Sequence, residues 1–228
     1  MKLENENFEI EFIDDNCTIY DKKFIRNLYN KINQEKKKIL NILQIKDCRK
    51  VKIKLYKEKE RFINDIKKFY EEYDIPVYCR GTIQEGIIYF WVNTELEENT
   101  YIYELELRKV VHEYIHILYE EYILCGKKRI TWVDEGIALN LSKERGKFIK
   151  ERFPILEKRV NKINLNELSH ENQTFMNEKV NGYDISYLTI KYFMETLTKE
   201  KFNKLIRDNE ELEKIRKRNM EKSKRIFQ

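Results

Sequence analysis

The chain has 228 residues, enough for one large domain or two small ones. Hydrophobic residues make up 41% and aromatic residues 13%, with only 6 Gly and 2 Pro, which excludes a disordered protein and favours helices with short connections. The net charge of +5 lies in residues 199–228, which contain 11 Lys/Arg and 6 Asp/Glu. The rest of the chain has equal numbers of positive and negative residues, which argues against a nucleic-acid-binding domain.

The four cysteines, at positions 17, 48, 79 and 125, include no C-x-x-C pair, which is typical of free thiols in a reducing cytosol. Residues 1–7 lack the apolar core of a signal peptide, and no apolar run approaches the ~20 residues of a membrane span. These features predict a cytoplasmic protein without a transmembrane segment, or one whose export signal has been removed.

The first part of the chain alternates between strand and helix patterns. Period-two alternation predicts strands at 8–13 and 51–56, and helical spacing of apolar residues predicts helices at 21–43 and 58–73. Two further strands are predicted at 77–80 and 86–92, with residues 81–85 as the turn. The second of these runs is interpreted as a buried strand, and also as the rim strand of a cleft that offers its backbone to an extended peptide.

The second half of the chain is predicted to be mostly helical. A long helix is expected at 101–124 and is terminated at Gly126. Thr131 and Asp134 form a predicted capping box that starts a new helix, which places Glu135 in its first turns. One helix broken by Pro154 and a polar loop are expected within 146–176, and further helices are predicted over the ranges 182–197, 200–206 and 210–220.

The long helix contains the sequence H-E-x-x-H, formed by His112, Glu113 and His116. Each helical residue advances by about 100°, so the two histidines share one face, and this spacing suits two imidazoles that bind one metal ion. Glu113 projects beside them and can reach a water molecule without being a ligand. Two of the three histidines in the chain fall in this motif, but catalytic zinc usually takes three protein ligands.

Glu135 is the predicted third ligand. It follows His116 after 18 residues, which leaves room for the end of one helix, a turn and the start of another. Asp134 is the competing carboxylate, although its capping role explains it more simply, and His170 is a competing imidazole that no spacing supports. The sequence therefore predicts one zinc ion held by two histidines and Glu135, with a position left open for water and substrate.

These motifs resemble those of a known family. The H-E-x-x-H motif, the 18-residue gap and Trp132-x-x-Glu135-Gly136-x-Ala138 look like the gluzincin metallopeptidases of the aminopeptidase N type, and the compact layout is most similar to the minigluzincins and peptidase-MA-like proteins. The segment 183–193 is similar to the family's Y-x-x-G-x-x-x-x-x-Y-L helix, with Ser186 in place of the family glycine. The resemblance covers roughly residues 8–206.

The resemblance implies an α+β, zincin-like metallopeptidase fold and a catalytic role for Tyr183, which would donate a hydrogen bond to the developing oxyanion; ordinary packing is the alternative for this tyrosine. With zinc polarising the scissile carbonyl, Glu113 would act as general base on a metal-activated water. Residues 81–85 match the family's G-x-M-E-N strand only loosely. Glu85 is out of register by one residue, so the sequence does not distinguish an aminopeptidase from an endopeptidase.

A single domain spanning 1–228 is predicted, in which a mixed sheet with helices occupies 1–100 and a catalytic helical part occupies 101–208. The active-site cleft is expected between these parts, and residues 209–228 form a basic tail. The expected partner is a peptide or protein substrate, with no prediction of oligomeric state.

Two alternatives remain open. One is a non-catalytic interaction protein in which zinc is structural. The other is a latent peptidase that its own tail holds inactive. The tail has basic clusters at 215–218 and 222–225. If they do not regulate activity, these clusters are interpreted as a solvated helix end, or as a weak candidate for contact with nucleic acid or an acidic membrane.

Overall fold

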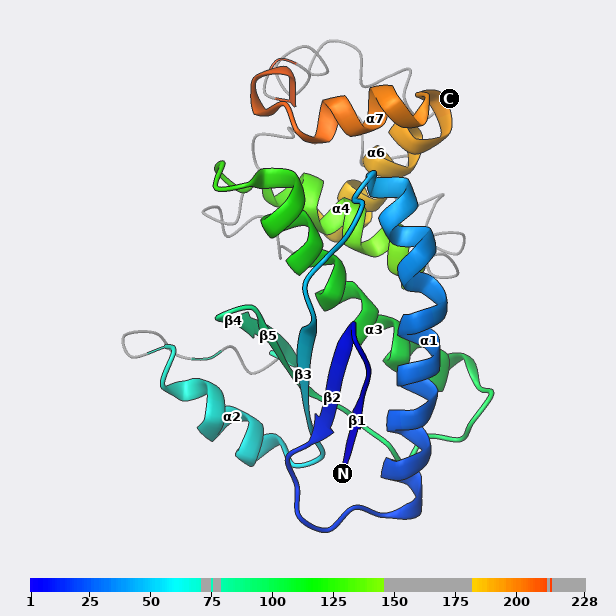
Figure 1. The fold of residues 1–228 in the computed structure, drawn as a ribbon, viewed down its shortest axis with the longest axis vertical. Helices are drawn as coiled ribbons and strands as arrows, with labels where there is room; N and C mark the ends of the chain where they lie inside the picture. Colours follow the sequence, from blue (N-terminus) through cyan, green and yellow to red (C-terminus); the bar gives the residue numbers. More distant parts are fainter. Residues whose placement is uncertain (71–74, 76–78, 146–181, 213, 215–228) are drawn as a thin grey trace. The chain divides into compact units, whose positions relative to one another are not determined.

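The computed structural model describes residues 1–70, 75, 79–145, 182–212 and 214. The chain divides into two compact units, Met1–Ile117 and Leu118–Gln228. Within the described ranges the structure contains a five-stranded mixed sheet and seven helices, which confirms the mixed helix-and-sheet class (Figure 1). None of the described helices combines the length and apolarity that crossing a membrane requires.

The sheet belongs to the first unit and has the order β1-β2-β3-β5-β4. The three inner strands run parallel to one another, whereas each edge strand is antiparallel to its neighbour. The strands are β1 (Lys2–Glu4), β2 (Phe8–Phe12), β3 (Val51–Tyr56), β4 (Gly81–Gln84) and β5 (Ile87–Trp91). The strands predicted at 8–13 and 51–56 are confirmed as β2 and β3, and β1 is an element that the sequence pattern did not indicate.

The hairpin of β4 and β5 corrects the prediction for residues 77–92. Residues 81–84 were expected to form a turn, but they pair with β5 as an edge strand. The turn is Glu85–Gly86, where both residues have positive φ (52° and 69°), as a two-residue type I′ hairpin requires. Residues 79–80 lie outside any strand, and 77–78 are outside the described residues.

The position of β5 also corrects its predicted role as a rim strand. It lies between β3 and β4, and its central residues Ile88 to Phe90 are at most 3% exposed, so the interpretation of a buried strand is confirmed. The edges of the sheet belong to β1 and β4.

Helices cover both faces of the sheet. Helix α1 (Ile19–Leu43) begins with a capping box between Thr18 and Asp21 and packs on β1 and β2. Helix α2 (Lys59–Lys67) packs on β3 and β5, where its apolar residues join a cluster with Tyr56 and Tyr89. The helices predicted at 21–43 and 58–73 are confirmed as α1 and α2, although α2 ends at Lys67.

Helix α3 (Tyr101–Leu118) carries the H-E-x-x-H motif and continues as the π-helix η1 (Tyr119–Leu124), so the two together match the helix predicted at 101–124. The ring of Tyr114 packs edge-on against that of Phe8 of β2, with the ring centroids 5.1 Å apart. The rings of Tyr103 and Phe24 of α1 pack in the same way, with centroids 5.8 Å apart. These aromatic contacts fix α3 on the sheet and α1. The helix ends where Cys125 adopts a left-handed conformation, one residue before the predicted stop.

The second unit contains α4 (Thr131–Ser142), α6 (Gly182–Thr196) and α7 (Lys199–Ile206), which confirm the helices predicted to start near 131, at 182 and at 200. The capping box predicted for Thr131 and Asp134 is wrong: the N-cap is Ile130 without a side-chain cap, and the Asp134 carboxylate pairs with Arg129. Helices α4 and α6 pack closely at Gly136.

The elements predicted within 146–176, including the break at Pro154, and most of the predicted helix at 210–220 are outside the described residues, as are His170 and the basic clusters of the tail. The single domain with its parts 1–100, 101–208 and 209–228, and the cleft between them, stay predictions.

Candidate metal centre

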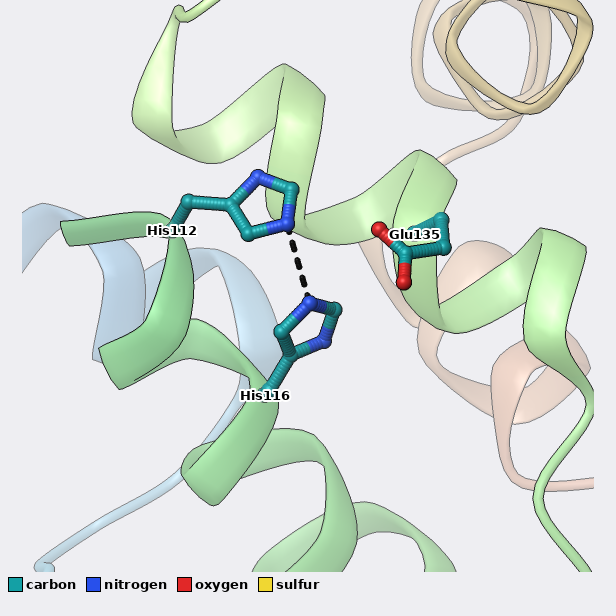
Figure 2. A group of neighbouring side chains, drawn as sticks. All are labelled: His112, His116 and Glu135. Carbon is teal, nitrogen blue, oxygen red and sulfur yellow. Dashed lines mark hydrogen bonds between the residues drawn. The ribbon is translucent and has the colours of Figure 1, made fainter. Parts of the chain in front are cut away.

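His112, His116 and Glu135 form a group whose potential ligand atoms all lie within 4.8 Å of one another (Figure 2). The three side chains are buried, with 8%, 8% and 5% of their residue surfaces exposed. Two imidazoles and a carboxylate are the donor set of many catalytic zinc sites, so these residues fit a single divalent metal ion. The structure therefore groups the three residues that the sequence predicted as ligands.

The two histidines lie one helical turn apart on α3, and their Nε2 atoms are 2.9 Å apart. The rings are nearly perpendicular, at 81°, and each turns the same nitrogen toward the other (Figure 2). These two nitrogens would be the histidine ligands of a metal ion bound here.

Glu135 lies in the second turn of α4, beside the guanidinium of Arg129. Nη2 of Arg129 is 3.5 Å from Oε1 of Glu135, and Nε of the same side chain is 2.5 Å from Oδ2 of Asp134. Burial lowers the pKa of Arg129, but the two adjacent carboxylates outweigh this effect, and the pKa is raised overall. Arg129 thus contacts both carboxylates, that of Asp134 more closely, and Glu135 is the one whose oxygen lies within reach of the two histidines.

Glu113, the predicted base, is half-buried on α3 and lies beside the first residue of β4. A Cβ atom placed on Gly81 would be 3.1 Å from Oε1 of Glu113 and 2.7 Å from Cε2 of Phe90. The contact with the Phe90 ring is too short for a real Cβ atom, so this position favours glycine, and Glu113 lies close by. The nearby Cys79 thiol has a raised pKa because it is buried and, to a smaller extent, because of the Glu113 carboxylate.

Tyr183 lies in the first turn of α6 and is half-buried. The guanidinium of Arg145 is 5.6 Å from the centre of its ring, and Nη1 of Arg145 is 2.9 Å from Oδ1 of the buried Asp184. These contacts fix the start of α6 against the residues after α4. The catalytic role of Tyr183 stays a prediction.

Several residues around the site were not indicated by the sequence. Arg129 and Arg145 each contact a site residue and belong to no spaced motif, whereas Gly81 lies near Glu113 and was noted only as part of the loose match to G-x-M-E-N. No signal in a single sequence marks such pairs, because their members become neighbours only when the elements pack.

No known protein family matches the chain by sequence, and a search of curated proteins finds no significant match either. The functional assignment therefore depends on the chemistry of the site itself.

Proposed function

We propose that the protein is a zinc-dependent metallopeptidase that hydrolyses peptide bonds in peptide or protein substrates. The observation that carries this proposal is the buried group of His112, His116 and Glu135, in which the two histidines flank Glu113 on one helix. When bound, the zinc ion would supply a Lewis acid that lowers the pKa of a water molecule to ~7 and polarises the scissile carbonyl.

Glu113 is the general base in this proposal. Its carboxylate accepts a proton from the attacking water and returns it to the leaving amine, which is neutralised as the peptide bond breaks. A purely structural zinc site needs no such base, since all four of its positions are closed by ligands. The carboxylate between the two histidines therefore favours a hydrolase over a non-catalytic zinc protein.

Strand β4 supports a peptide as the substrate. It is at the edge of the sheet, and among the described residues no strand pairs with its outer side. An open edge presents backbone N–H and C=O groups that an extended peptide can pair with. Because Gly81 at the start of β4 is in contact range of Glu113, a peptide bound along this strand lies next to the proposed base.

Tyr183 is the proposed donor to the oxyanion that forms on the carbonyl oxygen. Support comes from the packing of its helix: Ser186, one turn further along α6, lies against Gly136, the neighbour of Glu135. This packing brings the first turn of α6 into the neighbourhood of the proposed third ligand.

Metal analysis and a single substitution test the proposal. We expect protein purified without chelator to contain about one zinc per chain rather than iron, which the same donor set also accommodates. Glu113→Gln is expected to keep the zinc and to lose cleavage of a peptide library followed by mass spectrometry. Glu120→Gln, at an exposed position shortly after the motif, is the matched control and should cleave normally. Retained cleavage in Glu113→Gln would exclude Glu113 as the base.

A further inference from the structure

Another carboxylate on α3, that of Glu106, is buried and lies about two turns before Glu113. It pairs with the guanidinium of Arg80, and its other contacts are the backbone N–H of Asn93 at 3.2 Å and the ammonium of Lys109 at 3.1 Å. The proposed reaction gives Glu106 no role. Burying a carboxylate costs free energy that only such charged and hydrogen-bonding partners offset, so the burial of Glu106 requires an explanation.

Arg80 is held from two further directions. Its Nη2 donates a hydrogen bond to the backbone oxygen of Trp91 at 3.3 Å, and the guanidinium lies over the Trp91 ring at 4.8 Å. Arg80 directly precedes β4, and Trp91 is the last residue of β5. The ion pair with Glu106 therefore ties α3 to the open end of the β4–β5 hairpin.

Gly81, the next residue, lies near Glu113, since a Cβ atom on Gly81 would be 3.1 Å from Oε1 of Glu113. Among the described strands, β4 pairs with β5 alone, and edge strands open more easily than inner ones. The distance between this strand and Glu113 consequently depends on what secures β4 to α3. The Arg80–Glu106 pair, in which the carboxylate is buried and the guanidinium half-buried, is a polar contact at that point.

We propose that the Arg80–Glu106 ion pair is a positioning device, which holds β4 at a fixed distance from Glu113 so that a bound peptide is presented to the base. The catalytic consequence rests on the proposed peptidase function, whereas the mechanical role of the pair does not. Neither residue touches the substrate. Misplacement by about 1 Å can reduce turnover by about 100-fold, so the pair would act on kcat.

The chain contains its own reporters for the mechanical role. Cys79 lies two residues before Gly81 and donates a hydrogen bond to its backbone oxygen at 3.5 Å. Cys48 is the comparison thiol. It is also half-buried, and its sulfur lies 3.5 Å from the hydroxyl of Tyr114 on α3. The alkylation rates of both thiols by iodoacetamide, resolved by peptide mapping, distinguish local opening of β4 from loosening of the whole unit.

The test variant is Arg80→Met combined with Glu106→Leu, because it removes both charges of the pair together; the ammonium of Lys109, which also contacts Glu106, is half-buried and keeps access to water. The single Glu106→Gln is a second variant with a smaller change in shape. Glu104→Gln is the matched control, since Glu104 is on the same helix but pairs with Lys31 of α1. We expect Cys79 alkylation to accelerate by about tenfold or more in the double variant, with Cys48 unchanged within about twofold and the control unaffected.

Turnover provides the second measurement. In the double variant, kcat for a cleaved peptide is expected to fall by about 10- to 100-fold, with zinc content unchanged and KM less affected. Equal acceleration of Cys48 and Cys79, or no acceleration of Cys79, would overturn the positioning role, as would an unchanged kcat. If the unsubstituted protein cleaves no peptide while Cys79 alone responds, the peptidase proposal fails and the attachment of β4 by this pair stands.

Discussion

Gly136 and the carbonyl oxygen of Ser186 are so close that a Cβ atom on the glycine would lie 2.5 Å from that oxygen. This contact sets the separation of α4 and α6 next to Glu135. In Gly136→Ala the helices must move apart, which we expect to cost about 1–3 kcal/mol in the free energy of unfolding. Because Glu135 is the adjacent residue, zinc affinity should fall as well, measured by competition with a chromogenic chelator.

Gly126→Ala is the control for this substitution. Its Cβ would meet nothing within 4 Å, but its φ of +85° is strained for alanine. We expect about 1 kcal/mol of destabilisation without loss of zinc affinity. Equal zinc affinity in Gly136→Ala and the unsubstituted protein would show that the helix contact does not place Glu135.

Removal of the third ligand is expected to abolish zinc binding. In Glu135→Ala the metal content measured by mass spectrometry should drop well below one ion per chain, and added zinc should no longer raise the melting temperature. In the unsubstituted protein, zinc at a concentration of about 100 times its dissociation constant should raise the free energy of unfolding by about 2.7 kcal/mol. Asp134→Asn and His170→Ala remove the competing candidates and should retain the metal. Loss of zinc in either, with Glu135→Ala unaffected, would identify a different ligand.

Loss of the Tyr183 hydroxyl is expected to reduce turnover but not metal content. A donor to a developing oxyanion contributes roughly 100-fold or more to kcat, so Tyr183→Phe should be slower by about that factor. Tyr192→Phe, at an exposed position of the same helix, should cleave peptides at the normal rate. An unaltered rate in Tyr183→Phe would assign this tyrosine to packing alone.

Asp21 is expected to make folding stability depend on pH in the acidic range. Burial acts to raise the pKa of its carboxyl most strongly, but hydrogen bonds from the Thr94 hydroxyl and from the Thr18 backbone and hydroxyl outweigh it, and the pKa is lowered overall. A lowered pKa in the folded state means that the stabilisation is present above the unfolded-state pKa of ~3.9 and is lost as pH falls through the folded-state value.

The Asp21→Asn variant should therefore be less stable at neutral pH by about 1–2 kcal/mol in urea unfolding, and the difference should shrink as the pH falls below ~4. Asp15→Asn, at a strongly exposed carboxylate, is the control and should change little at any pH. A difference that stays constant through the acidic range would assign the effect of Asp21 to shape and not to charge.

The sequence by itself determined the elements whose signal is local. The helical spacing over residues 21–43 and 101–124 and the alternation at 51–56 were sufficient, because each pattern repeats within one element. The same holds for His112, Glu113 and His116, since one helical turn fixes their relation. The 18-residue gap to Glu135 also singled out the third member of the group, although the capping box assigned to Asp134 was wrong because Arg129 engages that carboxylate.

The tertiary structure alone decided which residues meet across elements. Residues 81–84 look like a turn because they contain a glycine and polar residues, yet pairing with β5 makes them a strand, in which a Cβ atom on Gly81 would clash with the Phe90 ring. The Arg80–Glu106 pair likewise joins residues that no periodicity relates. Spacing along a chain encodes neighbours within one helix or strand, whereas neighbours on different elements are selected by the burial of apolar faces, which acts on the whole unit at once.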